Sequence, residues 1–514
     1  MGRVLILGPA LFISCARIPP KAVPDNPITV EEVRLEGFDV LPPDARDELR
    51  DDLPIRAGAA LTSEVEKAAG ERAVEALQNH GYPYAQVALA REPVDVARTR
   101  VTLRADSGTL GFFGHVNIAG NRRVDDRVIR RRLAYSPGDL FRRSAIEQTQ
   151  QRIGALGLFK SVEIRAEDID ARPAAVPTLI TLEERTPWHW NVGAGYAAGE
   201  RLAVDARISH LNVFGSAERF DLQGRLSRIE RTAEAAFTQS DTWHPALSLS
   251  LLARHQEIDE HAFSVLSRGG QAAAAWQWTP DLSSTVSYAV SREESDVDPA
   301  LGPLLGLQDG MLSAWSLDVY RRAESASPTG SLSLHVEQAG GWMPGTFNYF
   351  SVVGSARRYR RALGDRVVLA ARVRAGSIDP RGSETDIPLL KRFFLGGSNE
   401  MRGWGIYELS PLSASGEPVG GTSLFTATGE VRAPIVRRLR GAVFVEAGNV
   451  WEQPWTMRPG DLRYDAGAGL RFDTPFGLIR VDFGYQLRPL EGLRIDGLPQ
   501  KSRWRFNLGI GEAF

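Results

Sequence analysis

From Pro187 to Phe514, apolar and polar residues alternate with a period of two, which is typical of β-strands. The clearest run is Arg480–Arg488, in which polar residues alternate with Val481, Phe483, Tyr485 and Leu487. The pattern recurs at Val367–Ala375 and at Trp504–Ile510. One face of such strands suits lipid and the other suits a polar lumen. We count about sixteen strands, so we expect an antiparallel transmembrane barrel over residues 186–514.

A soluble β-sandwich has alternating strands as well. Two features of this segment favour the barrel. Arginine and aspartate recur near the middle of the polar faces, and the chain stops at an aromatic residue, Phe514. The C-terminal part is therefore predicted to be an all-β domain that crosses a membrane.

Residues 28–108 and 109–185 have a different pattern, and each indicates a strand, two helices and two further strands. In the first segment, Ser63 and Glu66 have the spacing of a capping box, in which a serine caps the helix and a glutamate reaches back to it. Ser144 and Glu147 repeat this spacing about eighty residues later, which indicates an internal repeat. We expect two small α+β domains before the barrel.

Residues 1–15 have the features of a signal peptide. Arg3 is followed by an apolar stretch of about eleven residues, which is shorter than a membrane helix requires. Cys15 is the only cysteine, so an internal disulfide is excluded. Its position resembles a lipobox, in which the cysteine is acylated; the alternative is an incidental cysteine in a signal peptide that is cleaved elsewhere. Residues 16–27 then form a proline-rich linker.

The charge of the chain is nearly balanced, with 61 lysines and arginines against 63 aspartates and glutamates. Nucleic-acid binding would require a clustered basic surface, which this composition does not indicate. The eight histidines are scattered, without the spacing of metal ligands or of a catalytic triad. We therefore expect no nucleic-acid partner, no metal, no cofactor and no catalytic residue.

The second α+β segment carries a more specific resemblance. Its Gly120-Asn121 and Pro137-Gly138 turns and the run Leu156–Val162 resemble a POTRA domain, the periplasmic module of the BamA/TamA-type outer-membrane assembly family. The resemblance implies that residues 28–108 and 109–185 are two POTRA-like domains. In such modules, an exposed strand edge can take up an extended client segment.

A long connection at about residues 381–421 carries a glycine-rich motif that includes Gly396, Gly397, Arg402, Gly403 and Trp404. The motif resembles this family's loop that folds back into the barrel lumen, where the arginine contacts an acidic residue of a later strand. The resemblance implies that this acidic residue is Glu446, which lies close to Gly448.

An arginine in a partly wet lumen is costly unless it is paired. We therefore expect a bidentate Arg402–Glu446 pair that holds the loop to the barrel wall, and the alternative is a solvated loop arginine. On this interpretation, Arg402→Ala lowers assembly activity, and Arg402→Glu combined with Glu446→Arg partly restores it.

The first and last strands of the barrel segment both contain glycine, which weakens strand pairing and permits kinks. These glycines are Gly193 and Gly195 in the first strand and Gly509 and Gly511 in the last. Asn507, Gly509 and Phe514 also resemble the C-terminal β-signal of bacterial outer-membrane proteins, although Glu512 stands where that signal has an aromatic residue. The resemblance implies that the seam between these strands is a lateral gate.

The resemblance covers nearly all of the mature chain and implies an assembly or insertion factor in the bacterial outer membrane, with POTRA domains in the periplasm. Its partners would be the outer-membrane lipid bilayer and unfolded outer-membrane or secreted client proteins. Two POTRA modules are fewer than BamA usually has and nearer to the number in TamA. This favours a TamA-like member, for which a TamB-like periplasm-spanning partner is a candidate.

The alternative function is that of a two-partner-secretion-type translocator of the outer membrane. Such translocators share the barrel, two POTRA domains and the inward loop, but they begin with a plug helix. Four prolines disfavour a helix in that part of this chain, namely Pro19, Pro20, Pro24 and Pro27.

Overall fold

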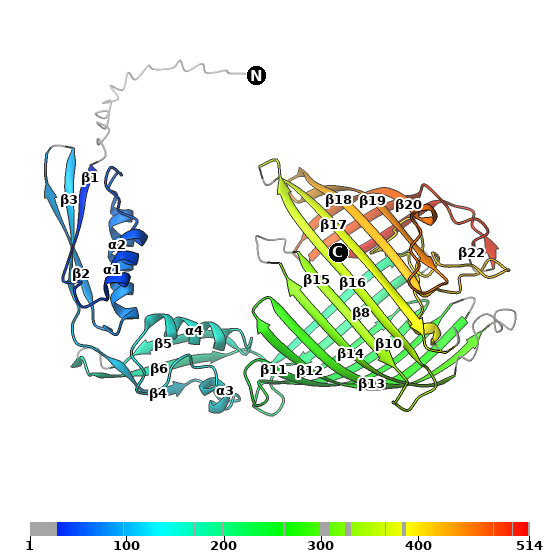
Figure 1. The fold of residues 1–514 in the computed structure, drawn as a ribbon, viewed down its shortest axis with the longest axis horizontal. Helices are drawn as coiled ribbons and strands as arrows, with labels where there is room; N and C mark the ends of the chain where they lie inside the picture. The colour runs from blue at the N-terminus through cyan, green and yellow to red at the C-terminus, as the bar shows by residue number, and fades with distance from the viewer. Residues whose placement is uncertain are drawn as a thin grey trace, which may run out of the picture. The chain divides into compact units, whose positions relative to one another are not determined.

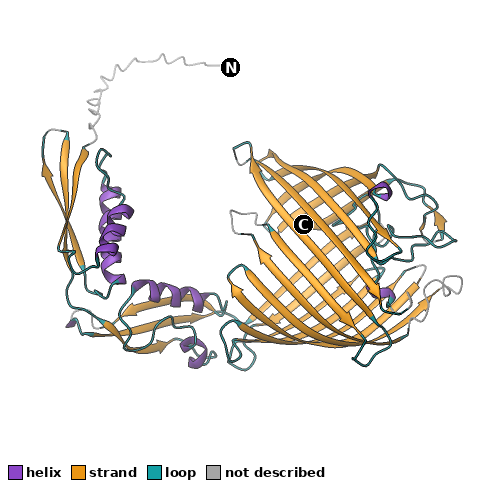
Figure 2. Cartoon of the chain, in the orientation of Figure 1, coloured by secondary structure: helices purple, strands orange, loops and turns teal. Residues whose placement is uncertain are grey.

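The computed structural model describes residues 28–511, apart from positions 96, 168–170, 198–199, 261–262, 298–308, 324–329, 365, 383–386, 476 and 496. The predicted signal peptide, Cys15 and the proline-rich linker lie outside the described residues, as does Phe514. The chain forms two compact units, and the larger one contains the barrel. Helices occur mainly in the N-terminal part, whereas the barrel consists of strands (Figure 2).

The first α+β module is a three-stranded sheet packed against two helices (Figure 1). Its elements are β1 (Thr29–Glu36), α1 (Pro43–Asp52), α2 (Ser63–Asn79), β2 (Gln86–Pro93) and β3 (Arg98–Asp106). The sheet order is β1-β3-β2, with β1 parallel and β2 antiparallel to the central strand. Ala69, Ala73 and Leu77 of α2 are fully buried against Val101 and Leu103 of β3, because they recur at helical spacing on one face.

The second module repeats this order of elements. It comprises β4 (Phe112–Ala119), α3 (Asp126–Arg130), α4 (Arg143–Gly154), β5 (Phe159–Ala166) and β6 (Ala175–Glu184). The sheet order is β4-β6-β5, and β4 is again parallel to the central strand. The internal repeat inferred from the sequence is therefore present in the topology.

The starts of the two long helices differ from the predicted capping boxes. Thr62, not Ser63, caps α2, and its hydroxyl oxygen accepts a hydrogen bond from the Val65 backbone N–H at 3.3 Å. Adjacent threonine and serine are both competent caps, so residue type alone could not choose between them. Ser144 lies inside α4, and its backbone N–H donates to the Asn79 side chain at 2.8 Å. A side chain from the end of α2 thus satisfies a helix terminus that Ser144 was expected to cap.

Glu184, the last residue of β6, holds the turn at 122–124. Its Oε1 accepts hydrogen bonds from the backbone N–H groups of Arg122, Arg123 and Val124 at 2.7, 2.7 and 3.0 Å. Burial raises the pKa of the Glu184 carboxyl, but these N–H donors and the Arg123 side chain lower it more, so the net pKa is below its ordinary value. The ionised carboxylate therefore stabilises this turn.

We expect Glu184→Gln to weaken protection of the amides at 122–124 from hydrogen exchange at pH 7, by about tenfold or more, since a hydrogen bond to a charged group contributes about 1.5–3 kcal/mol. Because the folded pKa is lowered, this stabilisation is present above the ordinary glutamate pKa and is lost as the pH falls through the folded value. Protection in the parent protein and the variant should therefore converge in acid. Equal protection at pH 7 would contradict this role.

In the described part of the chain, sixteen strands close into a barrel in which sequential strands pair antiparallel. The first eight are β7 (Trp188–Ala197), β8 (Arg201–His210), β9 (Glu218–Leu226), β10 (Glu230–Ser240), β11 (Leu247–Asp259), β12 (Phe263–Thr279), β13 (Leu282–Val297) and β14 (Gly310–Arg322). The others are β15 (Ser331–Ala339), β16 (Tyr349–Ala362), β17 (Val367–Pro380), β18 (Ser423–Val436), β19 (Leu439–Trp451), β20 (Arg463–Thr474), β21 (Gly477–Gln486) and β24 (Trp504–Ile510). The predicted sixteen-stranded antiparallel barrel is confirmed.

The alternating residues face opposite sides of the barrel wall. On β7, Trp190 and Val192 are exposed on the outer surface, whereas Gly193 lies opposite the lumen residue Asp205. On β21, Phe483 is exposed and Asp482 is fully buried. This is the arrangement that a lipid-facing exterior and a polar interior require. Among the described residues, no helix has the length and apolar character needed to cross a bilayer.

Candidate functional site

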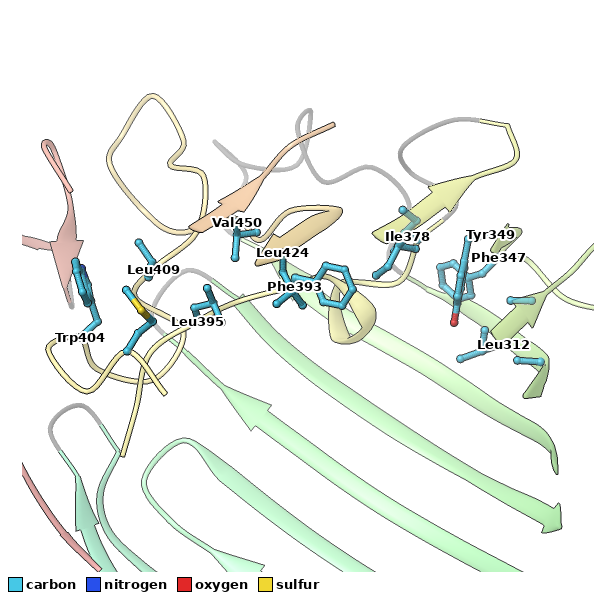
Figure 3. Close-up of a cluster of buried hydrophobic side chains, with 14 of the residues drawn as sticks. Leu312, Phe347, Tyr349, Ile378, Phe393, Leu395, Trp404, Leu409, Leu424 and Val450 are labelled. Carbon is cyan, nitrogen blue, oxygen red and sulfur yellow. The ribbon is translucent and has the colours of Figure 1, made fainter. Parts of the chain in front are cut away.

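The connection between β17 and β18 turns inward and is packed into the barrel. Isolated bridges pair Phe393 with Gly421 and Leu395 with Leu409, so the loop doubles back on itself. Leu395, Trp404 and Leu409 are almost completely buried in an apolar cluster. Figure 3 shows these loop side chains together with residues from several barrel strands, including Leu312, Tyr349, Leu424 and Val450. The loop and the barrel wall therefore share one hydrophobic cluster.

The glycines of the motif permit backbone conformations and contacts that other residues would not. Gly396 has a φ of +113°, and a Cβ there would lie 2.0 Å from the Gly405 carbonyl oxygen. Gly397 also has positive φ. A Cβ at Gly403 would lie 2.8 Å from the Asp465 Cβ, so the loop backbone approaches β20 directly at this position. On β19, Gly448 leaves room for the Met401 side chain.

Arg402 is completely buried, and carboxylates from three strands surround its guanidinium. Nη1 lies 2.7 Å from Glu430 Oε2 and 3.3 Å from Asp482 Oδ2. Nε lies 3.4 Å from Glu446 Oε1, and the guanidinium carbon sits 3.4 Å from the centre of the Phe444 ring. A buried arginine is tolerated only with such compensation, so the loop is attached to β18, β19 and β21 at once.

The structure brings Arg402 and Glu446 together, but the expected bidentate pair does not form. Glu446 instead accepts a hydrogen bond from the Arg402 backbone N–H at 2.5 Å and one from the Thr428 hydroxyl at 3.0 Å. Glu446 Oε1 also lies 3.4 Å from Arg402 Nε, but the guanidinium donates its hydrogen bonds from Nη1 to Glu430 and Asp482. Glu446 thus accepts its hydrogen bond from the loop backbone, whereas Glu430 and Asp482 accept those of the Arg402 side chain.

The residues that complete this buried network were not singled out from the sequence. Arg471 Nη1 lies 2.5 Å from Asp482 Oδ1, and its Nη2 lies 3.2 Å from Glu430 Oε1. Asp465 accepts a hydrogen bond from the Gly403 backbone N–H at 3.0 Å. The available signal was the recurrence of charged residues on the polar faces near mid-strand, which indicates a polar lumen but not which charges meet.

A second attachment lies two residues before Arg402. Glu400 accepts from Arg372 Nη2 at 2.6 Å and from Arg374 Nη1 at 2.7 Å, and both arginines belong to β17. On the other side, Arg480 of β21 donates to the Asn399 side chain at 3.1 Å. The loop tip is thus held by both β17 and β21, which have three strands between them in the barrel wall.

The seam between the first and last strands is paired over a short length. Among the described residues, β24 and β7 form a ladder only at Asn507↔Ala197 and Leu508↔Tyr196. By contrast, the β7–β8 ladder runs from Trp188↔His210 to Ala197↔Arg201. A Cβ at Gly195 would lie 3.3 Å from the Leu508 carbonyl oxygen, whereas a Cβ at Gly193 would make only ordinary contacts. The prediction that Gly511 lies in the last strand is wrong: β24 ends at Ile510, and Gly511 follows it with a φ of +95°.

The last strand also contacts the loop directly. Asn507 Nδ2 donates to the Arg402 carbonyl oxygen at 3.2 Å, and both groups are buried. A Cβ at Gly509 would lie 3.4 Å from Arg480 Nη2, the atom that donates to Asn399. The motif residues of the loop and of the last strand therefore belong to one connected site.

Comparisons with known proteins agree with this architecture. Residues 212–514 match the Omp85 superfamily domain, and residues 112–185 match a POTRA domain described as a surface antigen variable number repeat. The outer membrane protein assembly factor BamA of Neorickettsia risticii is 24% identical over 452 residues, which cover 85% of this chain and 60% of the relative. BamA of Neisseria meningitidis serogroup B is 20% identical over 497 residues, which cover 84% and 60%. This chain thus spans about 60% of the length of these curated relatives.

Two solved structures share the fold. BamA from Haemophilus ducreyi lacking POTRA domains 1–3 matches with a TM-score of 0.77 at 16% identity, covering 94% of this chain and 99% of that one. CdiB from Acinetobacter baumannii matches with a TM-score of 0.52 at 13% identity, covering 94% and 89%. Since the Omp85 match alone extends over more than half of the sequence, this chain belongs to the Omp85 superfamily, as an outer-membrane β-barrel with periplasmic POTRA structure.

Proposed function

We propose that this chain is an outer-membrane protein assembly factor that inserts or translocates client proteins through the seam between β7 and β24. The observation that carries the proposal is the short ladder at that seam, which is paired at two positions among the described residues. A strand can enter a closed barrel wall only where the hydrogen bonds between two neighbouring strands break, so opening costs least where that ladder is shortest. The curated relatives named above are assembly factors, which supports the same function here.

The chemistry of insertion would be hydrogen-bond exchange. When β7 and β24 separate, each presents a row of unpaired N–H and C=O groups. An extended client segment can pair with such an edge by β-augmentation, so that its backbone groups are satisfied before it meets lipid. We assign no bond-making or bond-breaking step to any residue.

The lumen loop would hold one side of this seam in place. Asn507 contacts the Arg402 backbone, and Arg402 is held by Glu430 and Asp482. This arrangement supports a role for the motif in keeping β21 and β24 rigid while β7 moves. The predicted roles of Gly193, Gly195, Gly509 and Gly511 in strand separation belong to the same proposal.

The periplasmic modules would deliver client segments along their open strand edges. In each module, one outer edge is already occupied by the chain itself, because β1 bridges to Ala60 and β4 bridges to Leu140. The edges formed by β2 and β5 have no such bridge among the described residues. We propose that β2 and β5 accept extended client segments. We also propose that this chain is a TamA-like member of its family and that it acts with a TamB-like partner.

Reconstitution of the purified protein in liposomes tests the function. We expect urea-unfolded outer-membrane barrels to fold faster in these liposomes than in empty ones, and to gain heat-modifiable migration on gels. A matched preparation with a passive porin of similar size controls for bilayer defects. Folding no faster than with the porin, together with export of a soluble client, would instead favour the two-partner-secretion-type translocator.

A further inference from the structure

A shallow apolar groove lies on the lipid-facing surface of the barrel, away from the lumen loop. It crosses β13 to β17, which run side by side in Figure 1. Small residues line its floor, namely Gly354, Ala356 and Ala375. Leu332 and Leu334 form one side, and both are exposed on the outer surface. The small residues leave a narrow depression between larger apolar side chains, and its shape suits a hydrocarbon chain.

Arginines lie at one end of this groove. Arg321 lines it and pairs in register with Leu332, which in turn pairs with Ala356. Arg358 and Arg360 follow Ala356 further along β16. They pair in register with Ala371 and Leu369, which are exposed on the outer surface, so both arginines face outward as well. With strands about 4.8 Å apart and about 3.3 Å per residue, the Arg321 and Arg358 backbones are separated by about 12 Å, a span that two arginine side chains can bridge to one phosphate.

These arginines are exposed, and none of the three has an ion-pair partner among the described residues. The neighbouring residues Arg357 and Arg361 alternate with them and lie on the lumen face, where Arg357 is opposite buried Arg372. Unpaired arginine on the outer wall of a barrel is costly within lipid but favourable at the level of the head groups. Their placement therefore indicates the head-group region.

The strand topology determines which leaflet of the membrane these arginines face. The POTRA structure is periplasmic, Glu184 ends its last strand, and Trp188 begins β7, so β7 starts at the periplasmic end of the barrel. Counting antiparallel strands from β7, both β14 and β16 run towards the periplasm. Arg321 lies next to the end of β14, and Arg360 lies close to the end of β16. The arginines therefore face the periplasmic leaflet, which consists of phospholipid.

We propose that this groove binds one anionic phospholipid of the periplasmic leaflet. An acyl chain lies over Gly354 and Ala356, and Arg321, Arg358 and Arg360 hold the phosphate. Guanidinium groups suit this role because they stay charged and donate two parallel hydrogen bonds to phosphate oxygens. The site is remote from the seam and does not depend on the function proposed above.

The charge requirement is tested by native mass spectrometry of the full chain released from micelles that contain equal amounts of dioleoyl phosphatidylglycerol and dioleoyl phosphatidylcholine. The parent protein should retain phosphatidylglycerol preferentially. Arg358→Gln combined with Arg360→Gln should lower that preference by about 10- to 30-fold, since each arginine near an anionic surface contributes about fivefold. The matched control, Arg357→Gln with Arg361→Gln, removes the same charge from the lumen face of the same strand and should change it less than about twofold.

The groove itself is tested by Gly354→Leu, which fills the floor without a clash because nothing lies within 4 Å of a Cβ there. It should abolish retention of one lipid molecule, whereas Gly224→Leu on β9, opposite exposed Ala233, should leave retention unchanged. Heat-modifiable migration confirms that each variant is folded. Equal lipid preference in the two double-arginine variants would overturn the proposal. The proposal would also be overturned if the Arg358→Gln/Arg360→Gln variant lost its lipid preference while Gly354→Leu retained lipid as the parent does. That result would mean that the arginines attract anionic lipid without a defined site.

Discussion

Replacing Arg402 by alanine is expected to release the lumen loop and to reduce the folding of client proteins in liposomes to near the level without the protein. The guanidinium compensates Glu430, Glu446 and Asp482, all of which are buried. Arg471 still pairs with Glu430 and Asp482 in the variant, but the network loses one of its buried positive charges. Removing one partner of a buried ion pair costs about 3–5 kcal/mol. That cost falls on the docked loop, because the sixteen-stranded wall keeps its own hydrogen bonds.

The measurement has two parts. Protease added to intact proteoliposomes should cleave the loop at 381–422 in Arg402→Ala but not in the parent protein, while heat-modifiable migration stays unchanged. The matched control is Arg440→Ala, which breaks the partly exposed pair with Asp473 at 2.8 Å. A surface pair of this kind contributes about 0–1 kcal/mol, so activity should stay within about threefold. Normal client folding by Arg402→Ala would show that the docked loop is not needed.

The geometry also changes the activity that we expect when the charges at positions 402 and 446 are exchanged. From the sequence, Arg402→Glu with Glu446→Arg should partly restore activity. In the structure, a glutamate at position 402 would face Glu430 and Asp482, and an arginine at position 446 would lose the hydrogen bond from the loop backbone. We therefore expect the double variant to be at least as impaired as Arg402→Ala. Recovery of activity would indicate that the two residues form a simple pair.

Closing the seam covalently is expected to stop client insertion. Tyr196 and Leu508 are register partners across the seam, so cysteines at these positions have the separation that a disulfide requires. With Cys15, the only native cysteine, replaced by serine, oxidation of Tyr196→Cys/Leu508→Cys should lower the rate of client folding at least tenfold. A reductant should restore it, because the uncrosslinked strands can separate again.

A crosslink between two strands that are not proposed to separate is the control for this experiment. Tyr196 also pairs in register with Leu202 on β8. Oxidised Tyr196→Cys/Leu202→Cys should fold clients within about twofold of its reduced form. If the oxidised seam variant is equally active, clients do not pass between β7 and β24, and the proposed mechanism is wrong.

Much of the architecture could be predicted from local pattern. Alternation along Arg480–Arg488 and Val367–Ala375 indicated strands with one apolar face, and the barrel with about sixteen strands is confirmed. The repeated order of strands and helices over residues 28–185 is also present. These features depend on residues close together in the sequence, where spacing alone decides which side chains share a face.

The position of the loop motif was equally visible, but its contacts were not. Gly396, Gly397 and Gly403 marked a tightly packed backbone, and Arg402 marked a charge in need of compensation. The choice of Glu430 and Asp482 as partners of the side chain depended on how β18 and β21 align across the lumen. The capping of α4 by Asn79 is a similar case, because the acceptor comes from another helix.

The sequence by itself thus determined the classes of element, the barrel and the place of the motif that enters it. Only the tertiary structure decided the ladder at the seam, the distribution of charges around Arg402 and the row of arginines beside the outer groove. The physical reason is the separation along the chain of the residues that interact. Periodicity and propensity act between neighbouring residues, whereas strand register and buried ion pairs join residues far apart in the chain, and their alignment is set by closure of the whole barrel.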